Sequence, residues 1–184
     1  MSRKTPGQPA GPWLTPAELR VWLAWIRIAL RMDHEMNRQL QEDSGLSLSD
    51  YHVLTTLGSA PEQRLQVSDL ASLIGWERSR LSHHLTRMQG RGLTRRLRSA
   101  SDGRATDVVL TDDGRTALAA AAPGHVARVR SLFFGGLDHA DLDPFAEVLE
   151  RVYDSILAGG SIPPPPVVPG HGGGRAARGA TAQP

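Results

Sequence analysis

The sequence RLQVSDLASLIGWERSRLSHHLTRMQGRGLTRRLRSASDGRATDVVLT, residues 64–111, decides the fold. Its SDLASLIG segment has the apolar spacing of a short helix that ends at Gly75. A second helix, rich in Arg, Ser and His, is predicted from about Glu77 to Gln89 or Arg91. Two alternating runs, LTRRL and TDVVLT, flank a polar loop and predict a β-hairpin. Two helices joined by a tight turn and followed by a basic hairpin are typical of a winged helix-turn-helix, which binds duplex DNA.

Further helices are predicted N-terminal to this stretch. Thr15 followed by Pro16 is typical of a helix start, and the helical pattern continues to about residue 42, with Gly45 after it. A second helix is expected to open at 49–51 and to end at Gly58, and residues 65–67 predict a short strand.

Two more helices are predicted C-terminal to the hairpin. Thr111 is suited to cap the first, which Pro123-Gly124 should kink or interrupt. Residues 138–157 carry apolar side chains at regular helical spacing and predict the second. The expected fold class is therefore mainly α with a small β wing.

The predicted organisation of the chain has three parts. Residues 15–158 form the folded domain, with a winged helix-turn-helix at about 48–114 and dimerisation helices at 15–44 and 112–158. Residues 1–14 are expected to be flexible, and the Pro/Gly-rich residues 159–184 are expected to be a disordered tail.

The basic charge is concentrated in one part of the chain. The formal net charge is +2, but residues 64–104 carry nine arginines against three acidic residues, a net +6. A local basic stripe indicates a surface that binds a polyanion, here the phosphate backbone of DNA. The alternative is an ordinary solvated surface, but Glu and Lys usually interleave on such a surface. Lys4 is the only lysine, so the preference for Arg also fits a bias in composition.

One face of the helix predicted from about Glu77 to Gln89 or Arg91 is suited to DNA. Leu81, Leu85 and Met88 fall together on the core side, with His84 at their margin. Short hydroxyls and long Arg or His side chains lie on the other side, where they can approach phosphates and base edges. The expected DNA-binding residues of the helix are Arg78, Ser79, Arg80, Ser82, His83, Thr86 and Arg87. In the wing, Arg98 and Arg104 are expected to contact DNA and Asp102 to orient the loop.

The first helix predicts a subunit interface. Residues 21–30 are apolar almost all round, which requires burial on two sides. The chain has few helices to surround this segment, so a homodimer is favoured. The alternative is that the segment is the central core helix of a monomer.

Several function classes are disfavoured. The sequence has no Cys, no Gly-rich phosphate loop and no GxSxG motif, which argues against an enzyme. The six histidines from His34 to His139 lack the spacing of metal ligands, so neither a metal nor a cofactor is expected. No signal peptide is expected, and the most apolar stretch is too short to span a bilayer, so a soluble cytoplasmic protein without a membrane partner is expected.

Residues from about 50 to 114 resemble the multiple-antibiotic-resistance regulator (MarR) family of bacterial repressors. The matching features are the SDLASLIG helix, the RSRLSHHLTRM helix, Gly92-Leu93, the Asp102-x-Arg104 wing and the LTDDG entry to the next helix. With the flanking helices the resemblance covers roughly 15–158. It implies a homodimer with two winged domains, a palindromic double-stranded DNA operator, and an effector pocket between the helical dimer region and each winged domain.

The resemblance also suggests which residues line that pocket. Trp22, Trp25, Tyr51 and His52 could surround a small aromatic or phenolic effector, although ordinary packing of both Trp in the dimer core is an alternative. The expected function is a transcriptional repressor released by such an effector. An effector-independent architectural DNA-binding protein is the other candidate, and it would not keep a preferred site once salt screens nonspecific binding.

Overall fold

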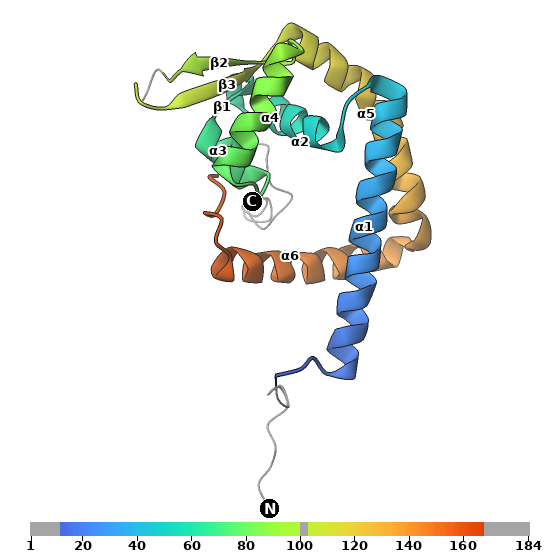
Figure 1. Ribbon diagram of the computed structural model, residues 1–184. Helices are drawn as coiled ribbons and strands as arrows, with labels where there is room; N and C mark the ends of the chain where they lie inside the picture. Colours follow the sequence, from blue (N-terminus) through green and yellow to red (C-terminus); the bar gives the residue numbers. More distant parts are fainter. Residues whose placement is uncertain (1–11, 100–102, 168–184) are drawn as a thin grey trace, which may run out of the picture.

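A computed structural model describes residues 12–99 and 103–167 (Figure 1). The helices are α1 (Pro16–Ser44), α2 (Leu48–Gly58), α3 (Val67–Leu73), α4 (Arg78–Gly90), α5 (Asp112–Leu132) and α6 (Leu142–Gly159). The strands are β1 (Arg64–Gln66), β2 (Thr94–Arg98) and β3 (Thr106–Leu110), and three short 3₁₀ turns lie at Pro61–Gln63, Phe134–Gly136 and His139–Asp141. The prediction of a mainly α fold with a small β wing is confirmed.

The core lies inside the winged helix-turn-helix. Helices α2, α3 and α4 pack with a three-stranded antiparallel sheet of order β1-β3-β2. The central strand places Val108 opposite both Leu65 and Arg96. The side chains with the least exposure come from α2, α3, α4 and β3, and from the end of α1 and the turn after it: Leu40, Leu46, Val53, Leu54, Leu57, Leu70, Leu81, Leu85, Met88 and Val108. The apolar face predicted for α4 is therefore buried as expected.

Capping residues set the ends of the first two helices. Thr15 caps α1 in a capping box with Glu18, and Gly45 ends it in the left-handed conformation with a φ of 66°. The second helix begins at Leu48, earlier than predicted, because Ser47 is its N-cap and Asp50 completes the capping box.

Helix α5 is assigned as one helix through Pro123, so Pro123-Gly124 does not interrupt it. The helix bends about halfway along its length (Figure 1), which agrees with the predicted kink. A proline removes the hydrogen bond that its own nitrogen would donate, and its ring crowds the carbonyl four residues earlier, which bends a helix; the Pro123 side chain is exposed. Packing against α1 supports the helix at this point. A Cβ at residue 124 would lie 3.1 Å from Asp43 Oδ2 and 3.1 Å from Gln39 Nε2, so Gly124 allows the two helices to approach closely.

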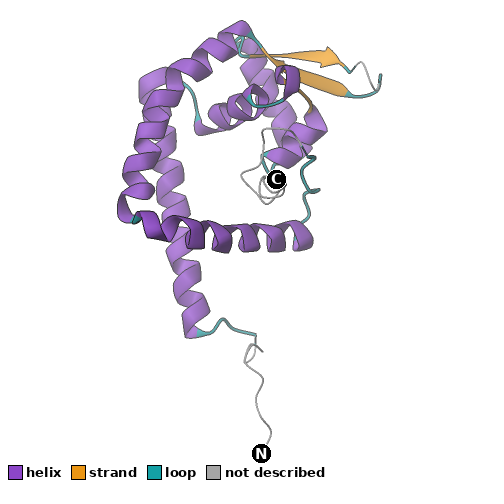
Figure 2. Ribbon diagram, turned by 180° about the vertical axis from the view of Figure 1, so that it is seen from behind, coloured by secondary structure: helices purple, strands orange, loops and turns teal. Residues whose placement is uncertain are grey.

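Helices α1 and α5 lie side by side, and α6 turns back from the end of α5 so that it runs beneath the winged helix-turn-helix in both views (Figure 1, Figure 2). The last helix begins four residues later than predicted, because residues 138–141 form a capped 3₁₀ turn. None of the α6 residues is buried, and α1 buries only Met36, Gln39 and Leu40. The N-terminal half of α1 projects past α6 (Figure 1). Large apolar faces of both helices therefore lack a partner within the described parts of the chain.

The predictions for the two ends of the chain fall mostly outside the described residues, which omit 1–11 and 168–184. Across the ranges that are described, none of the helices has the length and apolar character needed to cross a membrane.

Candidate DNA-binding site

The exposed side of α4 carries the side chains that the sequence assigned to it. Leu81, Leu85 and Met88 are buried, whereas the seven predicted DNA-binding residues of this helix are all exposed. The two sides alternate because an α-helix repeats every 3.6 residues. The arrangement leaves a row of hydroxyl, imidazole and guanidinium groups on one surface of the winged unit.

Arg96 of β2 connects the wing to this surface, and sequence reasoning did not single it out. Its Nη2 donates to the carbonyl oxygen of Ser82 at 2.5 Å, and its Nη1 donates to Thr86 Oγ1 at 3.3 Å. Thr86 Oγ1 itself donates to the carbonyl oxygen of Ser82 at 3.1 Å. The hydroxyl of Thr86 is thus already engaged inside the protein, while Arg96 adds a further cation beside α4.

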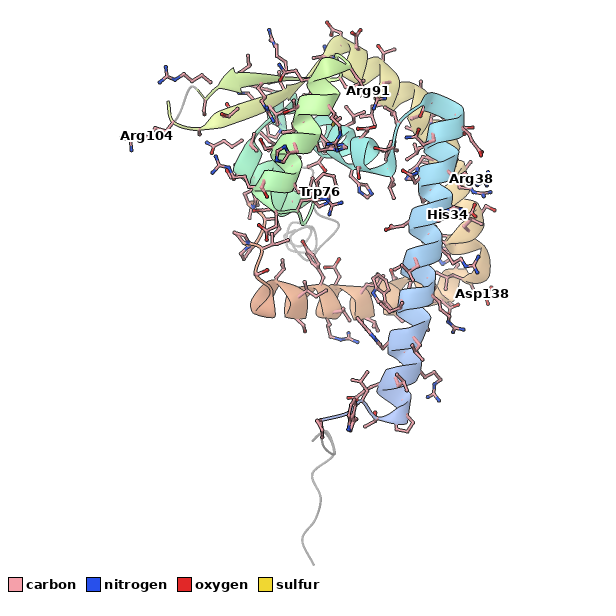
Figure 3. All side chains as sticks on the ribbon, in the orientation of Figure 1. His34, Arg38, Trp76, Arg91, Arg104 and Asp138 are labelled. Carbon is pink, nitrogen blue, oxygen red and sulfur yellow. The ribbon has the colours of Figure 1, made fainter. Side chains whose placement is uncertain are left out.

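The wing places its arginines at the tip of the hairpin. The side chain of Arg104 points away from the body of the molecule (Figure 3). Arg98 is braced within the loop, because its Nε donates to the carbonyl oxygen of Gly103 at 2.9 Å. Asp102, predicted to orient this loop, lies outside the described residues.

Two arginines of the basic stripe pair with buried carboxylates. Arg64 Nε donates to Asp107 Oδ2 at 2.6 Å, which ties β1 to β3. Arg91 Nη1 donates to Asp50 Oδ2 at 2.7 Å, and its Nη2 donates to the carbonyl oxygen of Gly45 at 2.9 Å. The charges of these two arginines are largely compensated, so the positive field comes from the other arginines of α4 and the wing.

Asp50 is the centre of a buried polar network. Besides Arg91, it accepts from the backbone nitrogen of Ser47 at 2.9 Å, and its Oδ1 lies 3.0 Å from His84 Nε2. The ring N–H is not aimed straight at this oxygen, so the contact is mainly electrostatic. Burial alone would raise the pKa of Asp50, but the contacts with His84, Ser47 and Arg91 outweigh it and hold that pKa far below its ordinary range.

Trp76 packs at the other end of the same network. Its ring meets the ring of His84 edge to face, with centroids 5.4 Å apart. The guanidinium carbon of Arg80 lies 4.1 Å from the centroid of Trp76, which is a cation–π contact. Trp76 and Arg91 mark opposite ends of α4 in Figure 3. The network therefore runs along one flank of the helix.

The four residues expected to form an effector pocket do not come together in this chain. Trp22 and Trp25 are half exposed, at 52% and 49%, in the N-terminal half of α1. Helix α2, which carries Tyr51 and His52, follows the other end of α1 and donates the Leu48 backbone N–H to the Asn37 side chain. Fifteen residues of helix between Trp22 and Asn37 span roughly 22 Å. Any pocket at Tyr51 is lined without these two Trp of the same chain.

Tyr51 has a different neighbour, which sequence reasoning missed. Its ring lies 4.3 Å from the ring of His125 on α5, measured between centroids. The Nδ1 atom of His125 is buried and has no hydrogen-bond partner among the described residues. Burial lowers the pKa of His125, and the nearby His52 lowers it further. An apolar ring wall with one unsatisfied imidazole nitrogen can accept a hydrogen bond from a small polar ligand.

Comparison with known proteins identifies the family. A model described as the MarR family matches residues 46–106. Sco3205, a MarR family transcriptional regulator from Streptomyces coelicolor solved in complex with DNA, is 34% identical, with a TM-score of 0.77; the match covers 83% of this chain and 99% of that protein. The chain belongs to the MarR family.

Two other relatives agree with this assignment. AbsC, also a MarR family transcriptional regulator from Streptomyces coelicolor, is 34% identical with a TM-score of 0.75, over 79% of this chain and 98% of AbsC. The transcriptional repressor YetL of Bacillus subtilis (strain 168) is 23% identical over 138 residues, which are 75% of this chain and 81% of YetL.

As a MarR family member, the chain is a DNA-binding transcriptional regulator. Its family and structural neighbours are regulators and not enzymes, which confirms the prediction drawn from the missing catalytic motifs. Within the described ranges, no group of three or more His, Asp or Glu side chains is placed to hold a metal ion.

Replacement of Asp50 by Asn should destabilise the fold in a pH-dependent way. The native pKa of Asp50 lies below its unfolded value, so its ionised form stabilises the protein above about pH 4 and loses this contribution as the pH falls through the native pKa. We expect a loss of about 1–3 kcal/mol near neutral pH. Denaturant unfolding of both proteins between pH 7 and pH 3 should show the difference shrinking with acidification.

Asp143→Asn, at an exposed position of α6, is the matched control and should differ little from wild type at any pH in this range. A difference between wild type and Asp50→Asn that stays constant with pH would contradict a stabilising charge at Asp50.

Proposed function

We propose that this protein is a sequence-specific repressor that binds a palindromic operator as a homodimer and is released by a small aromatic or phenolic ligand. The observation that carries the DNA-binding part is the exposed side of α4, where hydroxyl, His and Arg side chains lie beside an Arg-bearing hairpin. As a regulator that must reach DNA, it would act in the cytoplasm.

The expected contacts follow from the shapes of the side chains. Ser79 and Ser82 are short, so they let α4 approach the major groove closely, and His83 can reach a phosphate or a base edge. Arg80 and Arg87 are long enough to donate two hydrogen bonds to the O6 and N7 atoms of a guanine. The remaining proposed DNA contacts are Arg78, Thr86, Arg98 and Arg104, with the wing arginines directed to the minor groove.

Exposed apolar surface supports the homodimer. Val21 and Leu30 of α1 are 68% and 69% exposed, and Val152 and Ile156 of α6 are 53% and 59% exposed. An open apolar hollow of about 490 Å³ lies where α5 leads into α6, lined by Val126, Val129, Arg130, Phe134, Leu137, His139 and Leu142. Large apolar side chains left exposed on neighbouring helices are typical of a surface that binds another protein. A two-fold axis would bring the α1 and α6 faces of two copies together.

The ligand is proposed to bind near Tyr51 and His125. The Tyr51 hydroxyl is protonated at neutral pH and can donate a hydrogen bond, and burial raises its pKa further; His125 Nδ1 lacks a partner among the described residues. A phenol or aromatic acid could use both groups. Trp22 and Trp25 would then pack in the core of the dimer and take no part in ligand binding. A ligand can release DNA only by favouring a dimer conformation in which the two α4 helices are wrongly spaced for the operator. The size of this effect is limited by the difference in the ligand's affinity for the two conformations.

Arg80→Ala and Arg87→Ala should weaken binding to an operator selected from random duplexes by about 1–3 kcal/mol each, if each arginine contacts a guanine. Binding to a scrambled duplex should change far less, because phosphate contacts do not depend on sequence. Titration of both duplexes at fixed salt measures the difference. Arg31→Ala, which removes an exposed charge from α1, is the control. Equal losses on both duplexes would reassign the arginine to phosphate, and no loss would remove it from the interface.

Sedimentation of the dilute protein should show a dimer, and Ile156→Glu should shift it toward monomer because a charge would be buried in the apolar face of α6. Glu150→Gln, on the same helix, should leave the dimer intact. The wild-type dimer should bind half-sites about 10 bp apart or a multiple of this. A wild-type protein that sediments only as monomer would contradict the proposal.

A panel of phenolic acids and hydrophobic drugs should contain compounds that weaken operator binding by about 5–150-fold, the range of a typical coupling free energy. His125→Phe should reduce this response, since it removes the imidazole nitrogen and keeps a ring beside Tyr51. If no compound changes operator affinity, the effector part of the proposal fails. Loss of any preferred sequence in high salt would instead favour an architectural DNA-binding protein.

A further inference from the structure

His84 contacts a proposed DNA-binding arginine through one ring nitrogen and a buried carboxylate through the other. Its Nδ1 lies 3.0 Å from Nη2 of Arg87, and its Nε2 lies 3.0 Å from Oδ1 of Asp50. The His84 side chain is only 7% exposed and Asp50 only 3%, whereas Arg87 is exposed on α4. The ring therefore joins the protein interior to the surface that we propose meets DNA.

The contact with Arg87 fixes where the ring proton lies. A guanidinium group can only donate hydrogen bonds, so the nitrogen that faces it must carry a lone pair. Nδ1 is consequently the acceptor, and the single ring proton is on Nε2, the side of Asp50. The negative charge of Asp50 favours this tautomer, because it attracts a proton on the nitrogen 3.0 Å away even though the N–H is not aimed straight at the oxygen.

Asp50 is itself held in place by several hydrogen bonds, so its carboxylate can orient the His84 ring. The Ser47 backbone nitrogen and Arg91 Nη1 both donate to Asp50 Oδ2, and Ser47 Oγ accepts from the Asp50 backbone nitrogen at 3.0 Å. These partners belong to the start of α2 and the end of α4. The carboxylate cannot shift without breaking the capping box of α2, so the His84 ring has a fixed reference point.

We propose that His84 is a positioning residue that orients the guanidinium of Arg87 for base recognition, and that Asp50 selects the tautomer this requires. An exposed arginine normally samples many rotamers and loses that freedom on binding. A hydrogen bond that already holds the group in one direction reduces this loss for the cognate base. The inference deepens, and rests on, the proposed contact between α4 and DNA.

The neighbouring Arg80 offers an internal control. It is held by the ring of Trp76 and not by a hydrogen bond to His84. Trp76 meets His84 edge to face, an interaction that a phenyl ring can also make. His84→Phe should therefore remove the support of Arg87 and leave that of Arg80 in place.

The test compares affinities for the selected operator and a scrambled duplex. His84→Phe should lose roughly tenfold on the operator and less than about twofold on the scrambled duplex, as expected for residues in direct contact. Combined with Arg87→Ala, it should cause no further loss beyond about twofold. Combined with Arg80→Ala, the two losses should multiply. Losses that multiply with Arg87→Ala as well would overturn the inference.

A second variant guards against a loss caused by misfolding. His84→Asn places its side-chain oxygen at the same bond distance from Cα as Nδ1, so it can accept from Arg87 while losing the contact with Asp50. It should recover part of the operator preference lost in His84→Phe. Unfolding transitions of all variants are measured alongside, and recovery in stability without recovery in preference would count against the positioning role.

The tautomer is tested without DNA. Nitrogen-15 NMR of the His84 ring in the full-length protein at neutral pH should show a proton on Nε2 and none on Nδ1, and Asp50→Asn should weaken that preference. A proton on Nδ1 in the wild-type protein would overturn the inference. If Arg87→Ala leaves operator binding unchanged, the proposed DNA contact of Arg87 fails as well, whereas an effect of Arg87→Ala without one of His84→Phe rejects only the positioning role.

Discussion

The winged unit depends on one buried negative charge, the carboxylate of Asp50. A lone carboxylate in this position would be costly, and three different elements supply the groups that stabilise it: the turn before α2, the recognition helix α4, and Arg91 after it. Because Arg91 also donates to the Gly45 carbonyl, the same cluster reaches the end of α1. The orientation of α4 relative to the long helix is therefore set by polar contacts as well as by the leucine core.

Charge and apolar surface are separated in this molecule. The exposed arginines belong to α4 and the wing, whereas the exposed large apolar side chains belong mainly to α1, α5 and α6. The wing and the N-terminal half of α1 lie at opposite ends of the molecule (Figure 1). Such a division lets one surface bind a polyanion while another binds a second copy, without competition between the two. It also explains why a net charge of only +2 is compatible with DNA binding, since the acidic residues are placed elsewhere.

Local patterns in the sequence predicted the elements well, because capping residues, period and turn chemistry act over a few residues. The core and exposed sides of α4 followed from helical spacing alone. The pairs Asp50–His84, Arg64–Asp107 and Ser82–Arg96 could not be predicted, because they depend on which faces meet across the fold. At Pro123 the local preference decided only part of the outcome: α5 bends near its middle (Figure 1), but it continues as one helix that packs against α1.

The hydrogen bond from Arg96 to the Ser82 carbonyl oxygen connects the hairpin to α4. With α4 in the major groove and the wing in the neighbouring minor groove, as proposed, this hydrogen bond would hold the two at a set distance from each other. The spacing between the two grooves varies with base sequence, even at positions that no side chain touches. A fixed distance between α4 and the wing would favour duplexes that need little deformation to fit, so a hydrogen bond inside the protein would contribute to the choice of operator without any contact to a base.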